Sequence, residues 1–211
     1  MSEKKKSNFE QMAENSRHMF LEYDKDLLAG KYGTAYDNEY LYITFLGDQF
    51  RIDRSTGFAA KKNALLSDWI PACAPETMIF YDIFCCGQTD AKAAAEYVNH
   101  NSLVLQLAAA SNPGEGQYSS YVSLFAGNAE KLKAACARLG GIPLPKGDVC
   151  SELELFDFMK IRFQFWEEDD EFPASIVLYM DTNILKFMHF ETTWYVSGRL
   201  LSRIGIEAGL M

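Results

Sequence analysis

The chain has 211 residues, of which 48% are hydrophobic and 14% aromatic, a composition that excludes an intrinsically disordered protein and allows one sizeable core. Its net charge is −9, which argues against nucleic-acid binding because phosphates are recognised by basic surfaces. No apolar stretch approaches the roughly 20 residues that cross a bilayer, and no apolar segment follows the N-terminal lysines as in a signal peptide. We therefore expect a cytoplasmic protein without a membrane anchor.

The predicted elements begin with a helix over residues 8–28, in which five apolar residues recur at helical spacing and form the expected inward face. These residues are Phe9, Met12, Phe20, Tyr23 and Leu27. Alternating apolar and polar residues then predict strands over 40–46 and 49–53, and a third strand over 58–60. The turns between them are short, which predicts an antiparallel meander.

The middle of the chain is predicted to be helical, over residues 65–73, 75–86, 90–97, 118–125 and 129–139. The helix over 75–86 is apolar nearly all round, so we expect it to be buried. Residues 111–119 are predicted to form a loop. Its Gly-Glu-Gly sequence lacks the preceding strand and the following Lys-Ser/Thr of a phosphate-binding loop.

The five cysteines, an odd number without a Cys-x-x-Cys spacing, indicate reduced thiols and exclude the common zinc knuckle. Cys85 and Cys86 end the apolar helix, so we interpret both as small buried hydrophobic residues.

The last third of the chain contains the clearest strand, over residues 158–166, after a linker predicted over 142–147. Its partner is predicted over 175–180, with an acidic turn at 167–173, and a final helix over about 189–204. These elements together predict a single α+β domain over residues 1–211, with a short flexible tail at about residues 1–7. The expected sheet is mostly antiparallel, a meander plus a C-terminal hairpin, and helices flank it.

Several segments of the C-terminal part carry a resemblance to a known family: residues 136–141, 147–148, 163–175, Asp181 and 191–195. The longest includes Phe-Gln-Phe-Trp-Glu-Glu-Asp-Asp-Glu-Phe-Pro. The chain resembles the family called Domain of Unknown Function 3786. The resemblance implies a one-domain protein of anaerobic bacteria and archaea, sometimes fused to an iron–sulfur cluster domain, and it implies no activity or catalytic residue. The cysteine motif of such a fused domain is missing here, so an iron–sulfur protein would be a separate partner chain.

The acidic hairpin is the candidate functional surface, because nine carboxylates and only two basic residues lie between Asp148 and Glu171. The candidate residues are Asp148, Trp166, Asp170, Glu171 and Asp181. Crowded carboxylates repel one another, and a divalent cation bound by oxygen ligands would relieve the repulsion. Alternatively, they cap backbone amides in a purely structural turn, recognise a partner, or work as a general acid–base pair.

Other chemical signatures are weak. His18, His100 and His189 have no metal-ligand spacing, and we expect His189 to be an ordinary half-exposed residue of the last helix. No nucleophile motif is present. The many aromatic residues, Tyr40 and Tyr42 among them, suit a pocket, an interface or the core.

The function that fits these observations is that of a non-enzymatic binding or accessory protein of anaerobic cytosolic metabolism, linked to an iron–sulfur or metal-cofactor system. A small enzyme that uses the acidic hairpin, directly or through a divalent cation, and a structural interaction partner are the alternatives. The residues specify neither the cofactor, the partner nor the oligomeric state.

Overall fold

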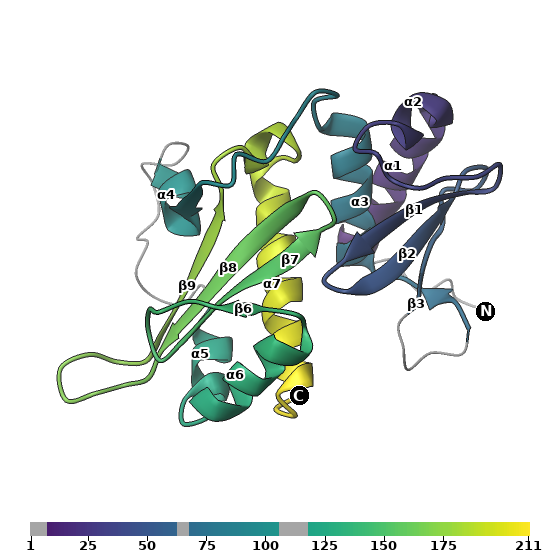
Figure 1. The fold of residues 1–211 in the computed structure, drawn as a ribbon. Coiled ribbons are helices and arrows are strands. Elements are labelled where there is room, and N and C mark those ends of the chain that lie inside the picture. The colour runs from purple at the N-terminus through teal and green to yellow at the C-terminus, as the bar shows by residue number, and fades with distance from the viewer. Residues whose placement is uncertain (1–7, 63–67, 106–117) are drawn as a thin grey trace. The chain divides into compact units, whose positions relative to one another are not determined.

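The structure is a computed structural model and describes residues 8–62, 68–105 and 118–211. These residues contain seven α-helices, one short 3-10 helix and nine strands (Figure 1). The predicted α+β class with a mostly antiparallel sheet is confirmed. Over the described ranges, no helix has the length and apolar content that a membrane span requires. The predicted tail at residues 1–7 lies outside the described residues, as does most of the predicted loop over 111–119. The predicted helix over 65–73 is wrong in its described part, because residues 68–73 are not helical and contain the strand β4 (Ile70–Pro71), which pairs with β3 (Ala59–Lys62).

The described residues form two compact units. The first unit consists of the chain up to Lys92 together with Leu185–Val196, and the second of Ala93–Ile184 together with Ser197–Met211. The single domain expected from the sequence stays a prediction.

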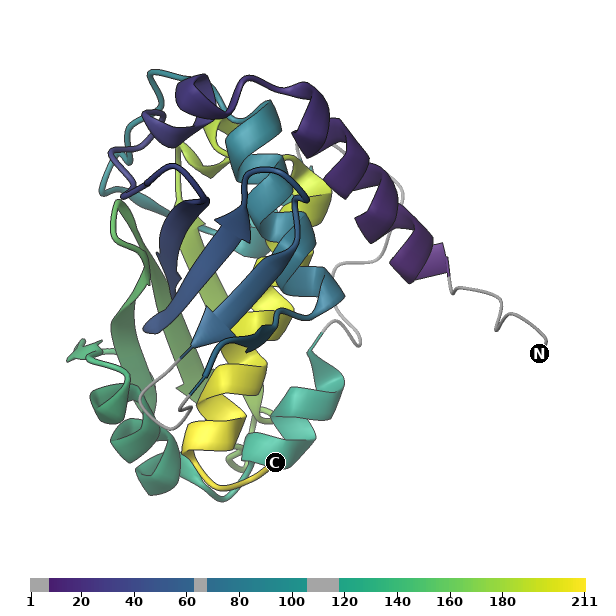
Figure 2. The same cartoon turned by 90° about the vertical axis from the view of Figure 1, so that its right-hand side faces the viewer.

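The first unit is built on four antiparallel strands in the order β4-β3-β2-β1 (Figure 2). Its elements are α1 (Asn8–Glu22), α2 (Lys25–Ala29), β1 (Tyr40–Phe45), β2 (Asp48–Asp53), β3 (Ala59–Lys62), β4 (Ile70–Pro71) and α3 (Ala74–Cys86). The predicted meander of three strands is confirmed, and so is the buried helix α3. Strands β1 and β2 bury alternate residues, and Phe80 of α3 contacts Phe45 and Phe50 at ring distances of 5.8 and 4.7 Å. The other face of β1 and β2 carries their half-buried polar residues.

The predicted single helix over 8–28 is wrong, because α1 ends at Glu22 and a second helix begins at Lys25. Asp24 caps a new helix, α2, by accepting hydrogen bonds from the backbone N–H groups of Asp26 and Leu27. The chain therefore changes direction within the predicted apolar face. Phe20 is fully buried as expected, whereas Met12, Tyr23 and Leu27 are exposed.

The second unit is also built on antiparallel strands, with β7, β8, β9 and β5 side by side and β6 paired with β7. Its elements are β5 (Tyr97–Asn99), α4 (His100–Leu105), α5 (Ser119–Phe125), α6 (Ala129–Arg138), β6 (Ile142–Pro143), β7 (Val149–Phe156), β8 (Met159–Trp166) and β9 (Ser175–Asp181). The 3-10 helix η1 (Ile184–Lys186) and α7 (Phe190–Glu207) follow, and α7 contributes to both units. The predicted C-terminal hairpin is confirmed, with Phe163 opposite Leu178. Phe125 of α5 packs edge-on against Phe163 at 6.1 Å.

Two predictions in this unit are wrong. The alanine-rich segment expected as a helix over 90–97 is irregular up to β5, because the Asp181 carboxylate holds the backbone N–H groups of Ala94 and Ala95. The second error concerns β7, which the sequence analysis missed, and the predicted linker over 142–147, which contains β6. The residues of β7 do alternate, with Leu153 and Leu155 buried and Glu154 between them exposed, whereas the two-residue strand β6 is defined by its pairing with β7.

Candidate functional site

The carboxylates at the base of the acidic hairpin accept hydrogen bonds from backbone N–H groups. Asp148 accepts a hydrogen bond of 2.8 Å from the backbone N–H of Glu167. The Glu167 carboxylate in turn accepts from the N–H groups of Gly127 and Ala129, at 2.8 and 3.1 Å, and so satisfies the start of α6. Trp166 beside them is 43% exposed. These contacts match the structural alternative considered for the hairpin.

The remaining candidate carboxylates do not converge. Asp170 and Glu171 are exposed in the turn. Asp181 is 1% exposed and lies at the last residue of β9, whereas the turn precedes Ser175, the first. The seven residues of β9 span about 20 Å from one end to the other. The structure therefore brings Asp148 and Trp166 to the base of the turn and leaves Asp181 at the other end of the hairpin.

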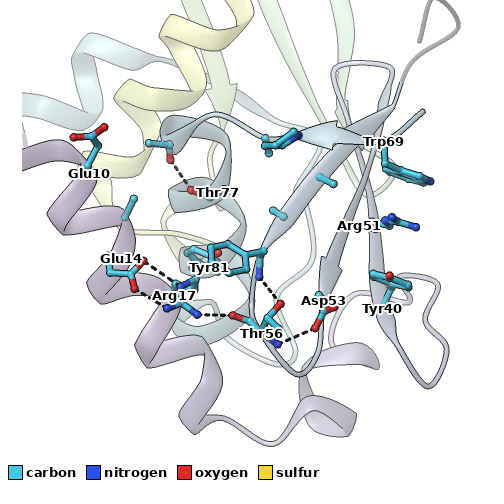
Figure 3. Close-up of a pocket in the computed structure, with 17 residues that line it drawn as sticks. Glu10, Glu14, Arg17, Tyr40, Arg51, Asp53, Thr56, Trp69, Thr77 and Tyr81 are labelled. Atoms are coloured by element: carbon cyan, nitrogen blue, oxygen red, sulfur yellow. Dashed lines mark hydrogen bonds and ion pairs between the residues drawn. The ribbon is translucent and has the colours of Figure 1, made fainter. Parts of the chain in front are cut away.

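A pocket of about 710 Å³ lies in the first unit, bordered by α1, the strands β1 to β3 and the start of α3. Figure 3 shows that its side chains form two groups on opposite sides of the strands. One group, with Glu14, Arg17 and Tyr81, lies on the side of the helices. The other, Tyr40, Arg51 and Trp69, points away from the helices. A small ligand would contact one group or the other.

The helix-side group is engaged in structural contacts. Arg17 binds the Glu14 carboxylate through two nitrogens, at 2.6 and 3.1 Å, and donates to the carbonyl oxygen of Thr56 at 2.5 Å. Tyr81 is 2% exposed and donates to the carbonyl oxygen of Gly57, and its burial raises the pKa of the phenol. These contacts tie α1 and α3 to the turn between β2 and β3. They leave little hydrogen-bonding capacity for a ligand.

The group that points away from the helices, which we name the Arg51 stack, consists of Tyr40, Arg51 and Trp69. The Arg51 guanidinium lies between the two rings, 4.3 Å from the centre of Tyr40 and 4.5 Å from that of Trp69 (Figure 3). Both contacts are of the cation–π type, which fixes the plane of the guanidinium and leaves its edge accessible. Within the described ranges, the guanidinium has no hydrogen bond or ion pair.

The residues around the stack set its charge. Arg51 lies opposite Ala60 in the β2–β3 register, so Lys62, two residues further along β3, is its diagonal neighbour. The Asp53 carboxylate on the same strand is occupied by the turn that follows it, accepting from the N–H groups of Ser55 and Thr56. Two cationic side chains therefore share this face, while the closest carboxylate on β2 is already hydrogen-bonded.

The histidines and cysteines differ from expectation in one respect. Cys85 is buried as predicted, but Cys86 is exposed. Partial burial and the Asp82 carboxylate raise the pKa of the Cys86 thiol to about 11, so at neutral pH the thiol is protonated and is a poor nucleophile. His189 lies just before α7 with its side chain 65% exposed, and its Nδ1 is 2.6 Å from Asp82.

The sequence analysis missed Arg51 and Trp69 as binding residues. Alternation in β2 does place Arg51 on the solvent face, between the buried Phe50 and Ile52. Tyr40 was among the aromatic residues considered, and β1 places it on the same face. Trp69, however, lies just before β4, and no sequence pattern predicts its contact with Arg51.

Comparisons with proteins of curated function and with solved structures give no match. One family profile does match, over residues 24–203 of the 211, which is far more than the C-terminal third that carried the strongest resemblance. The family is described as a domain of unknown function, so the match brings no activity and no site residues with it. The chain belongs to the family Domain of unknown function (DUF3786).

Proposed function

We propose that the chain is a non-enzymatic binding protein that recognises a carboxylate or phosphate group of its ligand through the Arg51 stack. The observation that carries this proposal is a guanidinium held between two aromatic rings without a hydrogen-bonding partner among the described residues. A planar guanidinium presents paired N–H donors that match the oxygens of a carboxylate or phosphate.

The rings favour binding at this position for two reasons. They hold the side chain of Arg51 in place in advance, so less conformational entropy is lost when a ligand arrives. They also supply apolar surface beside the charged edge, and Trp, Tyr and Arg are the residues that most often dominate the energy of binding interfaces. Lys62 adds a second positive charge on the same face.

The wider context is part of the proposal. An accessory role in anaerobic cytosolic metabolism, with a separate iron–sulfur protein as the partner, rests on the family resemblance. An acidic segment of such a partner would offer the carboxylates that Arg51 suits. A small organic acid would offer the same group, and the experiment below separates the two.

The test uses Trp69 as a fluorescent reporter. In a variant with Trp166→Phe and Trp194→Phe, Trp69 is the remaining tryptophan of the three in the chain, and it contacts the guanidinium directly. Titration with citrate, inorganic phosphate and a hexaglutamate peptide should give a saturable change in fluorescence for at least one of them. A preference for citrate indicates a small organic acid, and a preference for the peptide indicates a protein segment.

Matched variants decide the role of the guanidinium. Arg51→Gln should abolish the response, whereas Arg51→Lys keeps the charge without the planar donors and should weaken binding about 10-fold or more. Arg138→Gln removes a guanidinium that is 53% exposed in the other unit and should leave binding unchanged. A response that survives in Arg51→Gln, or no response to any of the three anions, would contradict the proposed function.

A further inference from the structure

Three metal-ligating side chains lie together at the C-terminal end of α3, and we name them the Asp82 cluster: Asp82, Cys86 and His189. Asp82 and Cys86 are four residues apart on α3, so their side chains share one face of the helix a turn apart. His189 comes from the segment just before α7. One ligand atom from each residue lies within 4.8 Å of the other two. All three residues belong to the first unit.

The backbone brings His189 to this position through a close approach at Gly87. A Cβ atom at residue 87 would lie only 2.5 Å from the carbonyl oxygen of Phe187, so a larger residue would force the two segments apart. With the segments in contact, the backbone N–H of His189 donates to Asp82 Oδ2 at 2.7 Å. The imidazole is therefore placed beside the end of α3 by main-chain contacts.

Hydrogen bonds to Asp82 already join the three side chains of the cluster. Asp82 Oδ1 is 2.6 Å from His189 Nδ1, and the Cys86 thiol is also hydrogen-bonded to the Asp82 carboxylate. The Asp82 side chain is 10% exposed, whereas Cys86 and His189 are exposed and accessible to an ion from solution. A hydrogen bond that only links α3 to the segment before α7 would require Asp82 and His189 alone. The Cys86 thiol adds a third possible metal ligand, a soft sulfur donor.

We propose that Asp82, Cys86 and His189 bind a transition-metal ion of the Zn²⁺ class, with solvent or a further ligand in the fourth position. Mixed oxygen, sulfur and nitrogen donors favour such ions over Mg²⁺ and Ca²⁺, which prefer oxygen alone. Tetrahedral coordination at about 2.0–2.3 Å requires donors about 3.3–3.7 Å apart. Side-chain rotations that move atoms by about 1 Å close the observed separation of up to 4.8 Å.

Binding is balanced by the loss of one proton. The Cys86 thiol becomes a thiolate and releases its proton to solvent, while the imidazole binds through the lone pair of a ring nitrogen. The position at the end of α3 favours a cation, because the negative end of the helix dipole lies there. Lys31 is the opposing charge, and its ammonium is bound to the carbonyl oxygen of Phe84 at 2.7 Å.

The test is a titration of the reduced full-length protein with Co²⁺, which replaces Zn²⁺ and is visible by absorption spectroscopy. A thiolate-to-cobalt charge-transfer band should appear, saturate at one equivalent and disappear when Zn²⁺ is added. Cys86→Ser should remove the band and weaken metal binding more than about 10-fold, since even the loss of an outer-shell partner costs that much. His189→Gln should weaken binding as well.

The controls separate coordination from folding. Cys73→Ser removes a half-buried thiol at the start of α3 and should leave the band intact. Because Cys86 is exposed, Cys86→Ser should melt within a few degrees of the wild type without metal, whereas Zn²⁺ should raise the melting temperature of the wild type alone. The absence of a charge-transfer band in the wild type, or its persistence in Cys86→Ser, would overturn the proposed site. Neither result involves the Arg51 stack.

Discussion

Because of His100, the free energy of unfolding should decrease as the pH falls from neutral to mildly acidic values. The side chain is 1% exposed at the start of α4, and its Nδ1 is 2.8 Å from the hydroxyl oxygen of Tyr118 and 3.5 Å from that of Ser197. Burial lowers the pKa of His100 from 6.5 to about 4, because the charged imidazolium loses its hydration in the interior. The folded protein therefore holds a neutral imidazole at pH values where the unfolded chain holds a charged one.

The sign and size of the effect follow from proton linkage. The unfolded chain takes up a proton as the pH falls below about 6.5, whereas the folded protein resists until about pH 4. The stability is therefore complete above the unfolded pKa and is lost between these two values. Between pH 7 and pH 5 the free energy of unfolding should fall by about 2 kcal/mol through His100, and by about 3 kcal/mol at pH 4.

The assay compares urea unfolding at pH 7 and pH 5 for the wild type and His100→Gln, which does not titrate but keeps a polar group near Tyr118. Carboxylates contribute equally to both proteins, so the difference in the two pH effects isolates His100. The variant should lose about 2 kcal/mol less than the wild type over this range. NMR titration of the imidazole in the folded wild type gives a second measurement, with His18, 61% exposed, for comparison. A His100 ring that titrates above pH 6, or a variant with an unchanged pH effect, would refute the reasoning.

Two further substitutions test the contacts of Asp181 and Gly147 in the second unit. Asp181→Asn should lower the free energy of unfolding in urea by about 2–3 kcal/mol, because a buried carboxylate that accepts three backbone N–H bonds becomes an amide with one oxygen. The control Asp170→Asn, at an exposed position, should change the free energy of unfolding by less than about 0.5 kcal/mol. Gly147→Ala should cost about 2–4 kcal/mol, since φ is +68° and the new Cβ would lie 2.8 Å from the carbonyl oxygen of Phe165. Gly140→Ala, at φ +74° with nothing within 4 Å, should cost only about 1–2 kcal/mol in the same assay. Equal losses for the two members of either pair would contradict these expectations.

Much of the local structure was predictable because the apolar pattern of each element matches one periodicity. β1 buries every second residue and β8 does so except at Gln164, which is also buried, so their core faces follow from alternation. The helix α3 is apolar nearly all round, and most of it is buried as expected. The prediction of one long first helix was wrong because Asp24 caps a new helix within the periodic apolar pattern. The strand β7 was missed although Leu153 and Leu155 alternate with glutamates, because this pattern is short and the residues before it, Val149–Ser151, are buried without alternation.

The candidate sites show the same division. Hydrophobic alternation in the flanking strands was sufficient to predict Asp170 in the acidic turn, whereas Asp148 was expected beside it from the segment before the hairpin. Which carboxylates are occupied by backbone N–H groups depends on distant segments, as when Glu167 binds the start of α6. The sequence by itself determined the α+β class, the meander, the C-terminal hairpin and the family. Only the tertiary structure joined Arg51 to Trp69 and Asp82 to His189, because such contacts are set by chain crossings between residues far apart, which no local periodicity encodes.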